Sequence, residues 1–264
     1  MNFRKTLLYF FLMGIMALHT VYAENAAENS SAAGTVSESA EKKISEAGDR
    51  PDAPPSVKEG SENGKGGKLS GELADEILKG VEKRYSGKGF IAYFKQMSTI
   101  KAMDITDTAE GKVFIKGPGM MRWEYEKPEK QIILTDGEEL WIFKPADNQV
   151  MTGKAPSYFG DGKGGGILSD IRIVRDKFTV TAESHKDSDY YQLLLIPGEK
   201  KPDLTAVRLF ITKKNYDIER IITYNAYEDE TLIEMEHLQF DQNIDDSVFS
   251  FQIPEGADVV QLEE

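Results

Sequence analysis

Cysteine is absent from the 264 residues of this chain, and histidine is scarce. Without a thiol the chain forms no disulfide, cannot be anchored through an acylated cysteine and has no cysteine nucleophile. The three histidines, His19, His185 and His237, do not occur at the spacings that metal sites use, and no nucleophile elbow accompanies them. We therefore expect no catalytic residue, no metal site and no cofactor.

Positive charge is also in deficit. Lys and Arg number 32 against 45 Asp and Glu, which gives a formal net charge of −13. Binding to nucleic acid requires a basic surface that faces the phosphates, and unspecific adhesion to an anionic membrane requires the same. We therefore exclude nucleic acid as a partner.

The amino terminus is typical of a secretory signal peptide. Arg4 and Lys5 precede a largely apolar run over 6–21, and Val21 and Ala23 are small enough for a signal peptidase. The run is too short and wrongly flanked for a convincing membrane span, with a retained anchor as the alternative. We expect a signal peptide over 1–23 and cleavage after Ala23.

A polar segment separates this leader from the rest of the chain. Residues 24–68 contain no aromatic residue and only Val36, Ile44 and Val57 as β-branched apolar ones. So little apolar surface cannot offset the entropy of ordering the backbone, so we expect a disordered, acidic linker rich in Gly, Ser and Pro. It acts as a spacer or docking arm, or is an unconstrained connection. Residues 69–264 suffice for one domain with a sizeable core.

One long helical pattern opens this domain. It begins near Leu69, Ser70 can cap its first turn, and Gly87 and Gly89 follow its end. An amphipathic helix must pack its apolar stripe on another element. That stripe consists of Leu73, Ile77, Leu78, Val81 and Tyr85.

Short β-type segments follow at intervals of roughly ten residues, separated by turn signals. Consecutive strands with such short connections should be antiparallel neighbours. We expect a mainly β (α+β) fold, built as one large, strongly curved antiparallel sheet. The predicted strands are 90–97, 111–116, 120–125, 131–135, 139–145, 178–182, 190–196, 206–212, 218–224, 231–240 and 248–253.

Several of these strands are apolar on both faces. In 120–125 one face carries Met121, Trp123 and Tyr125, and in 139–143 Leu140 alternates with the equally apolar Trp141. A sheet with one solvated face alternates cleanly between apolar and polar residues, so here both faces are partly covered or one face encloses a cavity. An ordinary packed core explains each residue singly, whereas the size of the curved sheet favours a cavity.

The order of motifs resembles that of the LolA family, the periplasmic carriers that ferry lipoproteins between the inner and outer bacterial membranes. The most specific matches are the Pro-Gly-x-x-Arg-Trp-x-Tyr run at 118–125 and the Phe-x-x-Pro-x-Gly-x-Asp-Val run at 251–259. Weaker matches, in the same order, are Phe94-Lys95-Gln96, Asp136-Gly137, Leu140-Trp141, Pro156 and Tyr191-Gln192-Leu193.

The resemblance implies an unclosed half-barrel of about eleven strands with a short helical lid over a hydrophobic cavity for acyl chains. In that family the arginine of the Arg-Trp pair helps to keep the lid shut, and this role would fall on Arg122; the alternative is a strand arginine paired with Glu124 or a neighbouring carboxylate. The cavity residues implied are Phe94, Met121, Trp123, Tyr125, Ile133, Leu140, Trp141, Ile167, Leu168, Leu193 and Leu195.

The lid is expected over 154–170, where Pro156, Tyr158 and Phe159 precede a glycine-rich stretch. Clustered glycines can act as hinges of a lid, and a flexible surface loop is an equally good interpretation of this stretch. The resemblance further implies a periplasmic monomer that carries the acyl chains of lipoproteins or of a related lipid, with an inner-membrane LolCDE-type ABC exporter and an outer-membrane acceptor such as LolB as partners. A non-carrier periplasmic module of the same fold, a ligand sensor or an envelope assembly factor, is the alternative.

Overall fold

The computed structural model describes residues 66–163, 165–184 and 188–262. The predicted signal peptide 1–23, almost all of the predicted linker 24–68, and His185 lie outside these residues. The described chain is mainly β, with one twelve-stranded sheet and four α-helices. The strands are β1 (Phe90–Ile100), β2 (Ile105–Lys116), β3 (Met120–Lys127), β4 (Gln131–Asp136), β5 (Glu139–Lys144), β6 (Gln149–Lys154), β7 (Phe178–Ser184), β8 (Tyr190–Pro197), β9 (Ala206–Thr212), β10 (Ile218–Tyr224), β11 (Glu230–Phe240) and β12 (Asp258–Gln261). The helices are α2 (Gly66–Tyr85), α3 (Ala155–Phe159), α4 (Gly166–Ser169) and α5 (Ile173–Lys177).

The sheet is open and has β12 and β7 as its two edges. The strand order is β12-β6-β5-β4-β3-β2-β1-β11-β10-β9-β8-β7. All neighbours are antiparallel except β12 and β6, which run parallel, so the expectation of a wholly antiparallel sheet is wrong at this edge. The predicted strand 248–253 is also wrong. A 3₁₀ helix spans Asp246–Phe249 instead, and the side chain of Asp245 accepts a hydrogen bond from the Ser247 amide at its start.

Helix α2 begins at Gly66, before Ser70, so Ser70 lies inside the helix and does not cap it. Its predicted apolar stripe is confirmed, because Ile77 and Val81 are fully buried. At the carboxyl end the Tyr85 hydroxyl accepts a hydrogen bond of 2.9 Å from the Ile218 amide of β10. This bond fixes the helix to the sheet. Within the described residues, no helix combines the length and the apolar character that a membrane crossing requires.

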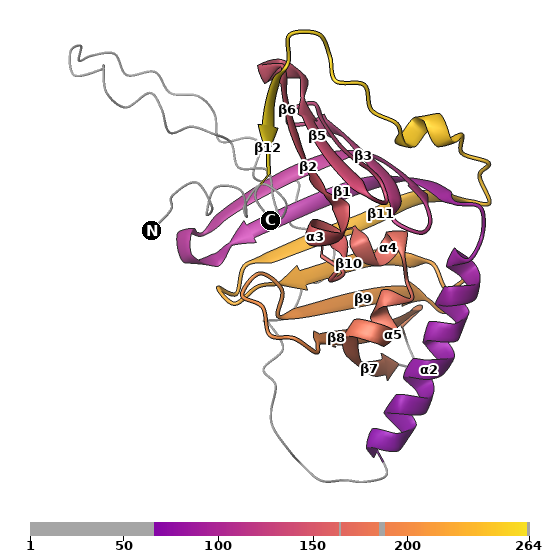
Figure 1. The fold of residues 1–264 in the computed structure, drawn as a ribbon. Coiled ribbons are helices and arrows are strands. Elements are labelled where there is room, and N and C mark those ends of the chain that lie inside the picture. Colours follow the sequence, from indigo (N-terminus) through magenta and orange to yellow (C-terminus); the bar gives the residue numbers. More distant parts are fainter. Residues whose placement is uncertain (1–65, 164, 185–187, 263–264) are drawn as a thin grey trace, which may run out of the picture.

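One face of the sheet, called the inner face here, packs against α2 and against residues 155–177, which contain α3, α4 and α5 and connect β6 to β7. We call residues 155–177 the lid. Figure 1 shows the three lid helices within the bend of the sheet and α2 running along its side. The core of the domain therefore lies between the inner face, α2 and the lid.

The opposite, outer face is covered in part by the segment between β11 and β12. Phe249 of this segment is buried, and the ring of Phe251 lies 6.3 Å from that of Trp141 and 5.7 Å from that of Phe143. This covering explains why β4 and β5 are apolar on both sides. The Phe-rich run that resembles a strand packs on the sheet and does not join it.

Candidate functional site

The inner face carries a continuous apolar cluster with an aromatic group in it. The ring of Phe94 meets the rings of Trp123 and Tyr125 edge to face, at 4.9 Å between centroids in both pairs. Tyr125 is half-buried and packs against the cluster. The other predicted cavity residues that are buried in this cluster are Met121, Ile133, Leu140, Ile167, Leu168, Leu193 and Leu195. The members of this set that belong to strands thus share the inner face, and Ile167 and Leu168 of the lid pack against them within the bend of the sheet.

The lid lies directly on the aromatic group. Ile167 and Leu168 of α4 are buried on its underside, and Gly165 is so close to Trp123 that an added Cβ would lie 2.5 Å from Cζ2 of the indole. Only glycine permits this approach. Tyr158 and Phe159 are half-buried against the same cluster, whereas Pro156 is exposed. The helical part of the lid extends to Lys177, beyond the predicted end at residue 170.

Two ion pairs connect the lid to the loop between β8 and β9. Lys163 pairs with Asp203, whose side chain is only 5% exposed, and Asp161 pairs with Lys201. The hydrogen bond from Lys201 lowers the pKa of Asp161 below its usual value. Asp203 Oδ2 is buried without a hydrogen bond of good geometry, so the Lys163 ammonium neutralises it mainly through charge.

Further contacts hold the carboxyl-terminal half of the lid. The Gly119 amide donates a hydrogen bond of 3.4 Å to the Ser169 carbonyl, and Arg175 of α5 donates to Asp75 of α2 at 2.8 Å. Arg175 also pairs with Glu82. The lid is thus held at its underside by apolar contact and at its margins by a few polar contacts.

Arg122 and Trp141 lie on the outer face. In β3, Arg122 alternates with Met121 and Trp123, and its guanidinium donates to Glu124 at 2.6 Å and to the Val248 carbonyl at 3.2 Å. Both partners are outside the lid, so the structure matches the ion-pair alternative and gives no support to a latch. Trp141 lies opposite Leu134 and contacts Phe251, so it does not share the inner face with the other predicted cavity residues.

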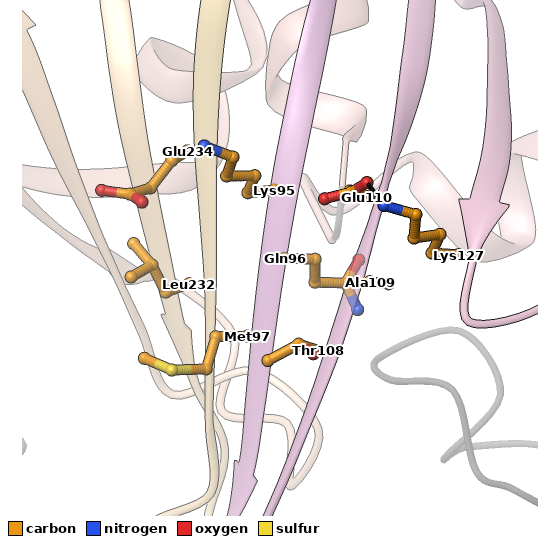
Figure 2. A pocket seen from close by; sticks show the side chains of 9 residues that line it. All are labelled: Lys95, Gln96, Met97, Thr108, Ala109, Glu110, Lys127, Leu232 and Glu234. Carbon is orange, nitrogen blue, oxygen red and sulfur yellow. Dashed lines mark ion pairs between the residues drawn. The ribbon is translucent and has the colours of Figure 1, made fainter. Parts of the chain in front are cut away.

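Figure 2 shows a pocket of about 260 Å³ beside the strands β11, β1 and β2. Lys95 and Met97 of its lining alternate with Phe94 in β1 and so belong to the outer face. Its charges are compensated: Lys127 pairs with Glu110 at 2.7 Å, Lys95 with Glu236 at 2.7 Å, and Glu234 with Arg220 at 3.0 Å. Gln96 and Ala109, from positions that alternate onto the inner face, also line this pocket.

A protein-family model described as outer membrane lipoprotein carrier protein LolA matches residues 86–252. This chain belongs to the LolA family. Among its relatives, the outer-membrane lipoprotein carrier protein of Methylobacillus flagellatus is 27% identical over 169 residues, which cover 64% of this chain and 80% of the relative. The protein of the same name from Chromohalobacter salexigens is 28% identical over 153 residues, or 58% and 71% of the two chains. The crystal structure of a LolA superfamily protein from Nitrosomonas europaea covers 67% of this chain and 97% of its own, with a TM-score of 0.43 and 18% identity.

Two features of this LolA-family site were not predicted from the sequence. The Lys163–Asp203 pair joins two loops that are far apart in the chain, and no local pattern signals it. The second feature is a hydrogen bond of 3.0 Å from the Tyr125 hydroxyl to Gln96 Oε1. A signal for it exists, because Gln96 is a polar residue that continues the otherwise apolar inner positions of β1.

Proposed function

We propose that this protein carries the acyl chains of lipoproteins, or of a related lipid, between the inner face of its sheet and the lid. The observation that carries the proposal is the lid itself. Its underside is apolar and rests on an aromatic group of the sheet through a glycine contact, and ion pairs and hydrogen bonds to α2, to Gly119 and to the loop between β8 and β9 hold it around this contact. Lifting such a segment exposes a continuous apolar surface without disrupting the sheet.

The driving force for loading is the burial of hydrocarbon. Each methylene removed from water contributes about 0.8 kcal/mol, whereas displacing Ile167 and Leu168 from their buried positions costs roughly 1.5–3 kcal/mol for each side chain. A chain of about fifteen methylenes therefore outweighs the displacement of the lid. The closed lid subtracts part of the gain, which keeps the passenger releasable. No bond is made or broken in this cycle.

The family and the leader sequence support a proposal for the location and the partners. The curated relatives are named outer-membrane lipoprotein carrier proteins, and residues 1–23 have the layout of a secretory signal peptide. We infer that the protein works in the periplasm as a monomer. It would receive its passenger from a LolCDE-type exporter and deliver it to an outer-membrane acceptor such as LolB.

The two tryptophans offer a matched test, because Trp123 lies on the inner face and Trp141 on the outer face. Two single-tryptophan proteins, Trp141→Phe and Trp123→Phe, are titrated with a synthetic triacylated peptide that carries bromine on its acyl chains. Bromine quenches indole fluorescence only at short range. We expect saturable quenching of Trp123 and little quenching of Trp141.

The possible results separate the alternatives. Preferential quenching of Trp141 would place the lipid on the outer face and refute the proposed site. If neither tryptophan is quenched, and native mass spectrometry of protein purified from its own periplasm repeatedly finds no lipid, the carrier proposal fails. A ligand sensor or an assembly factor with a filled core would then be the better description.

A further inference from the structure

At one end of the inner face the apolar cluster gives way to uncharged hydrogen-bonding side chains. The Tyr125 hydroxyl donates to Gln96 Oε1 at 3.0 Å, and Gln96 Nε2 donates to Ser98 Oγ at 3.2 Å. Ser98 Oγ in turn lies 3.2 Å from Thr231 Oγ1 of β11. These four residues form a row across β3, β1 and β11, which we call the polar row.

The polar row directly adjoins the aromatic group. The ring of Tyr125 lies 4.9 Å from that of Phe94, which also meets Trp123 beneath the lid. Gln96 is 7% exposed and Thr231 is 8% exposed, so their polar atoms are withdrawn from water. Buried polar atoms destabilise a core unless they are hydrogen-bonded, and here the side chains satisfy one another.

The end of β3 leaves this region open toward solvent. The pairing of β2 with β3 stops at Glu110 and Lys127, whereas the pairing of β2 with β1 continues to Ile105. The pocket of about 260 Å³ in Figure 2 lies on the outer face beside this step, so the sheet separates it from the polar row. A group held at the polar row could reach solvent only around the unpaired edge of β2, beyond the end of β3.

We propose that the polar row is the subsite for the ester and amide carbonyl groups at the head of an acylated passenger. This inference rests on the proposed carrier function and adds the orientation of the cargo. Acyl chains lie along Phe94 and Trp123, and the polar remainder leaves past Lys127. The carbonyl oxygens accept hydrogen bonds from the second amide hydrogen of Gln96 and from the Tyr125 hydroxyl, which turns away from Gln96 Oε1 when the ligand binds.

The chemistry of the row selects this class of ligand. Its members are a phenol, a carboxamide and two hydroxyls, all of them uncharged, so they match neutral carbonyl groups better than a phosphate or a free carboxylate. Burial raises the pKa of Tyr125 well above its usual range, which keeps its hydroxyl protonated and able to donate. Binding sites of this kind are mostly apolar and use a few polar groups to orient the ligand.

The test compares two lipids that differ only at the carbonyl groups. The full-length protein is titrated with an ester-linked diacylglycerol and with its ether-linked dialkyl analogue. Binding is measured as the loss of fluorescence when each lipid displaces a bound fluorescent fatty acid. A neutral hydrogen bond changes an affinity by roughly threefold to tenfold. We expect the wild-type protein to prefer the ester by about this factor, and Tyr125→Phe to reduce the preference by weakening ester binding alone, since the Gln96 amide remains as a donor.

Two further variants guard against a loss of folding and against an unspecific effect. Gln96→Leu combined with Tyr125→Phe replaces both partners of one hydrogen bond, which is less disruptive than leaving one partner unsatisfied. Tyr93→Phe removes a hydroxyl from the outer face and should leave the ester preference unchanged. Equal binding of both lipids by the wild-type protein, or an unaltered ester preference in Tyr125→Phe, would overturn the subsite while leaving the carrier function standing. If neither lipid binds, both proposals fall together.

Discussion

The pair of Lys163 and Asp203 should control how often the empty lid opens. Asp203 lies on a loop that is fixed to the sheet, since the Ala226 amide donates to the Pro202 carbonyl at 2.8 Å and the Thr205 amide donates to the Tyr224 carbonyl at 2.8 Å. Lys163 belongs to the lid itself. When the lid lifts, the lysine leaves and Asp203 becomes hydrated.

The substitution Lys163→Met leaves Asp203 without its compensating charge in the closed state only. Removal of one partner from a buried ion pair costs about 3–5 kcal/mol. Because the Lys163 side chain is 21% exposed, solvent screens part of this cost. We therefore expect Lys163→Met to destabilise the closed lid by about 2 kcal/mol. The open population should rise roughly thirtyfold. In the double variant of Lys163→Met with Asp203→Leu, apolar side chains replace the ion pair. The open population of the lid should then return to within about threefold of the wild-type value.

Trp123 reports the opening, because the lid covers its indole. In a Trp141→Phe background Trp123 is the single tryptophan, and its quenching by acrylamide is measured without any lipid. Lys201→Met is the matched control, since its pair with Asp161 is about one third exposed on each side and should contribute at most about 1 kcal/mol. Unchanged quenching in a folded Lys163→Met protein would refute the reasoning. A fall in the free energy of unfolding with no change in quenching would assign the pair to global stability.

Three other outcomes are expected. Gly165→Ala places a methyl group against Trp123 and should raise the open population of the lid, measured by acrylamide quenching of Trp123, at least about fivefold, because overpacking costs about 1–3 kcal/mol. The hydrogen bond from Lys201 lowers the pKa of Asp161, so the ionised carboxylate favours the closed lid. This stabilisation of the closed lid is fully present above the ordinary pKa of 3.8. It is lost as the pH falls through the lower pKa that Asp161 has in the closed state. Trp123 quenching should therefore increase below about pH 4, and less so in Asp161→Asn. Arg122→Leu should leave both quenching and lipid loading unchanged, and a changed loading rate would reinstate a latch on the outer face.

The sequence predicts the strands well where side chains alternate and turn residues separate them. β6 and β12 were missed for different reasons. β6 follows a turn signal and contains Gly153, so it lacks a clear β pattern. β12 has four exposed residues and is held by parallel pairing to β6, which is a property of the fold and not of its local sequence.

Alternation predicts which residues share a face but not which face is buried by which partner. Trp141 looked as suited to a cavity as Leu140, but it lies on the outer face, where the segment after β11 covers it. The role of Arg122 was open for the same reason. Long-range ion pairs such as Lys163–Asp203 form only where two loops that are distant in the sequence lie side by side. Local sequence patterns do not predict which loops these are.

The lid bridges the two halves of an open sheet. It leaves the sheet at β6, one strand from the β12 edge, and rejoins it at β7, the opposite edge. It therefore works like a strap across the opening of the half-barrel. The length of chain between β6 and β7 limits how far the two edges of the sheet can move apart. The lid should therefore limit the size of the bound lipid, whereas the side chains of the sheet determine which chemical groups it contacts. Shortening or lengthening this segment should change the number of acyl chains accepted without altering the surface that they touch.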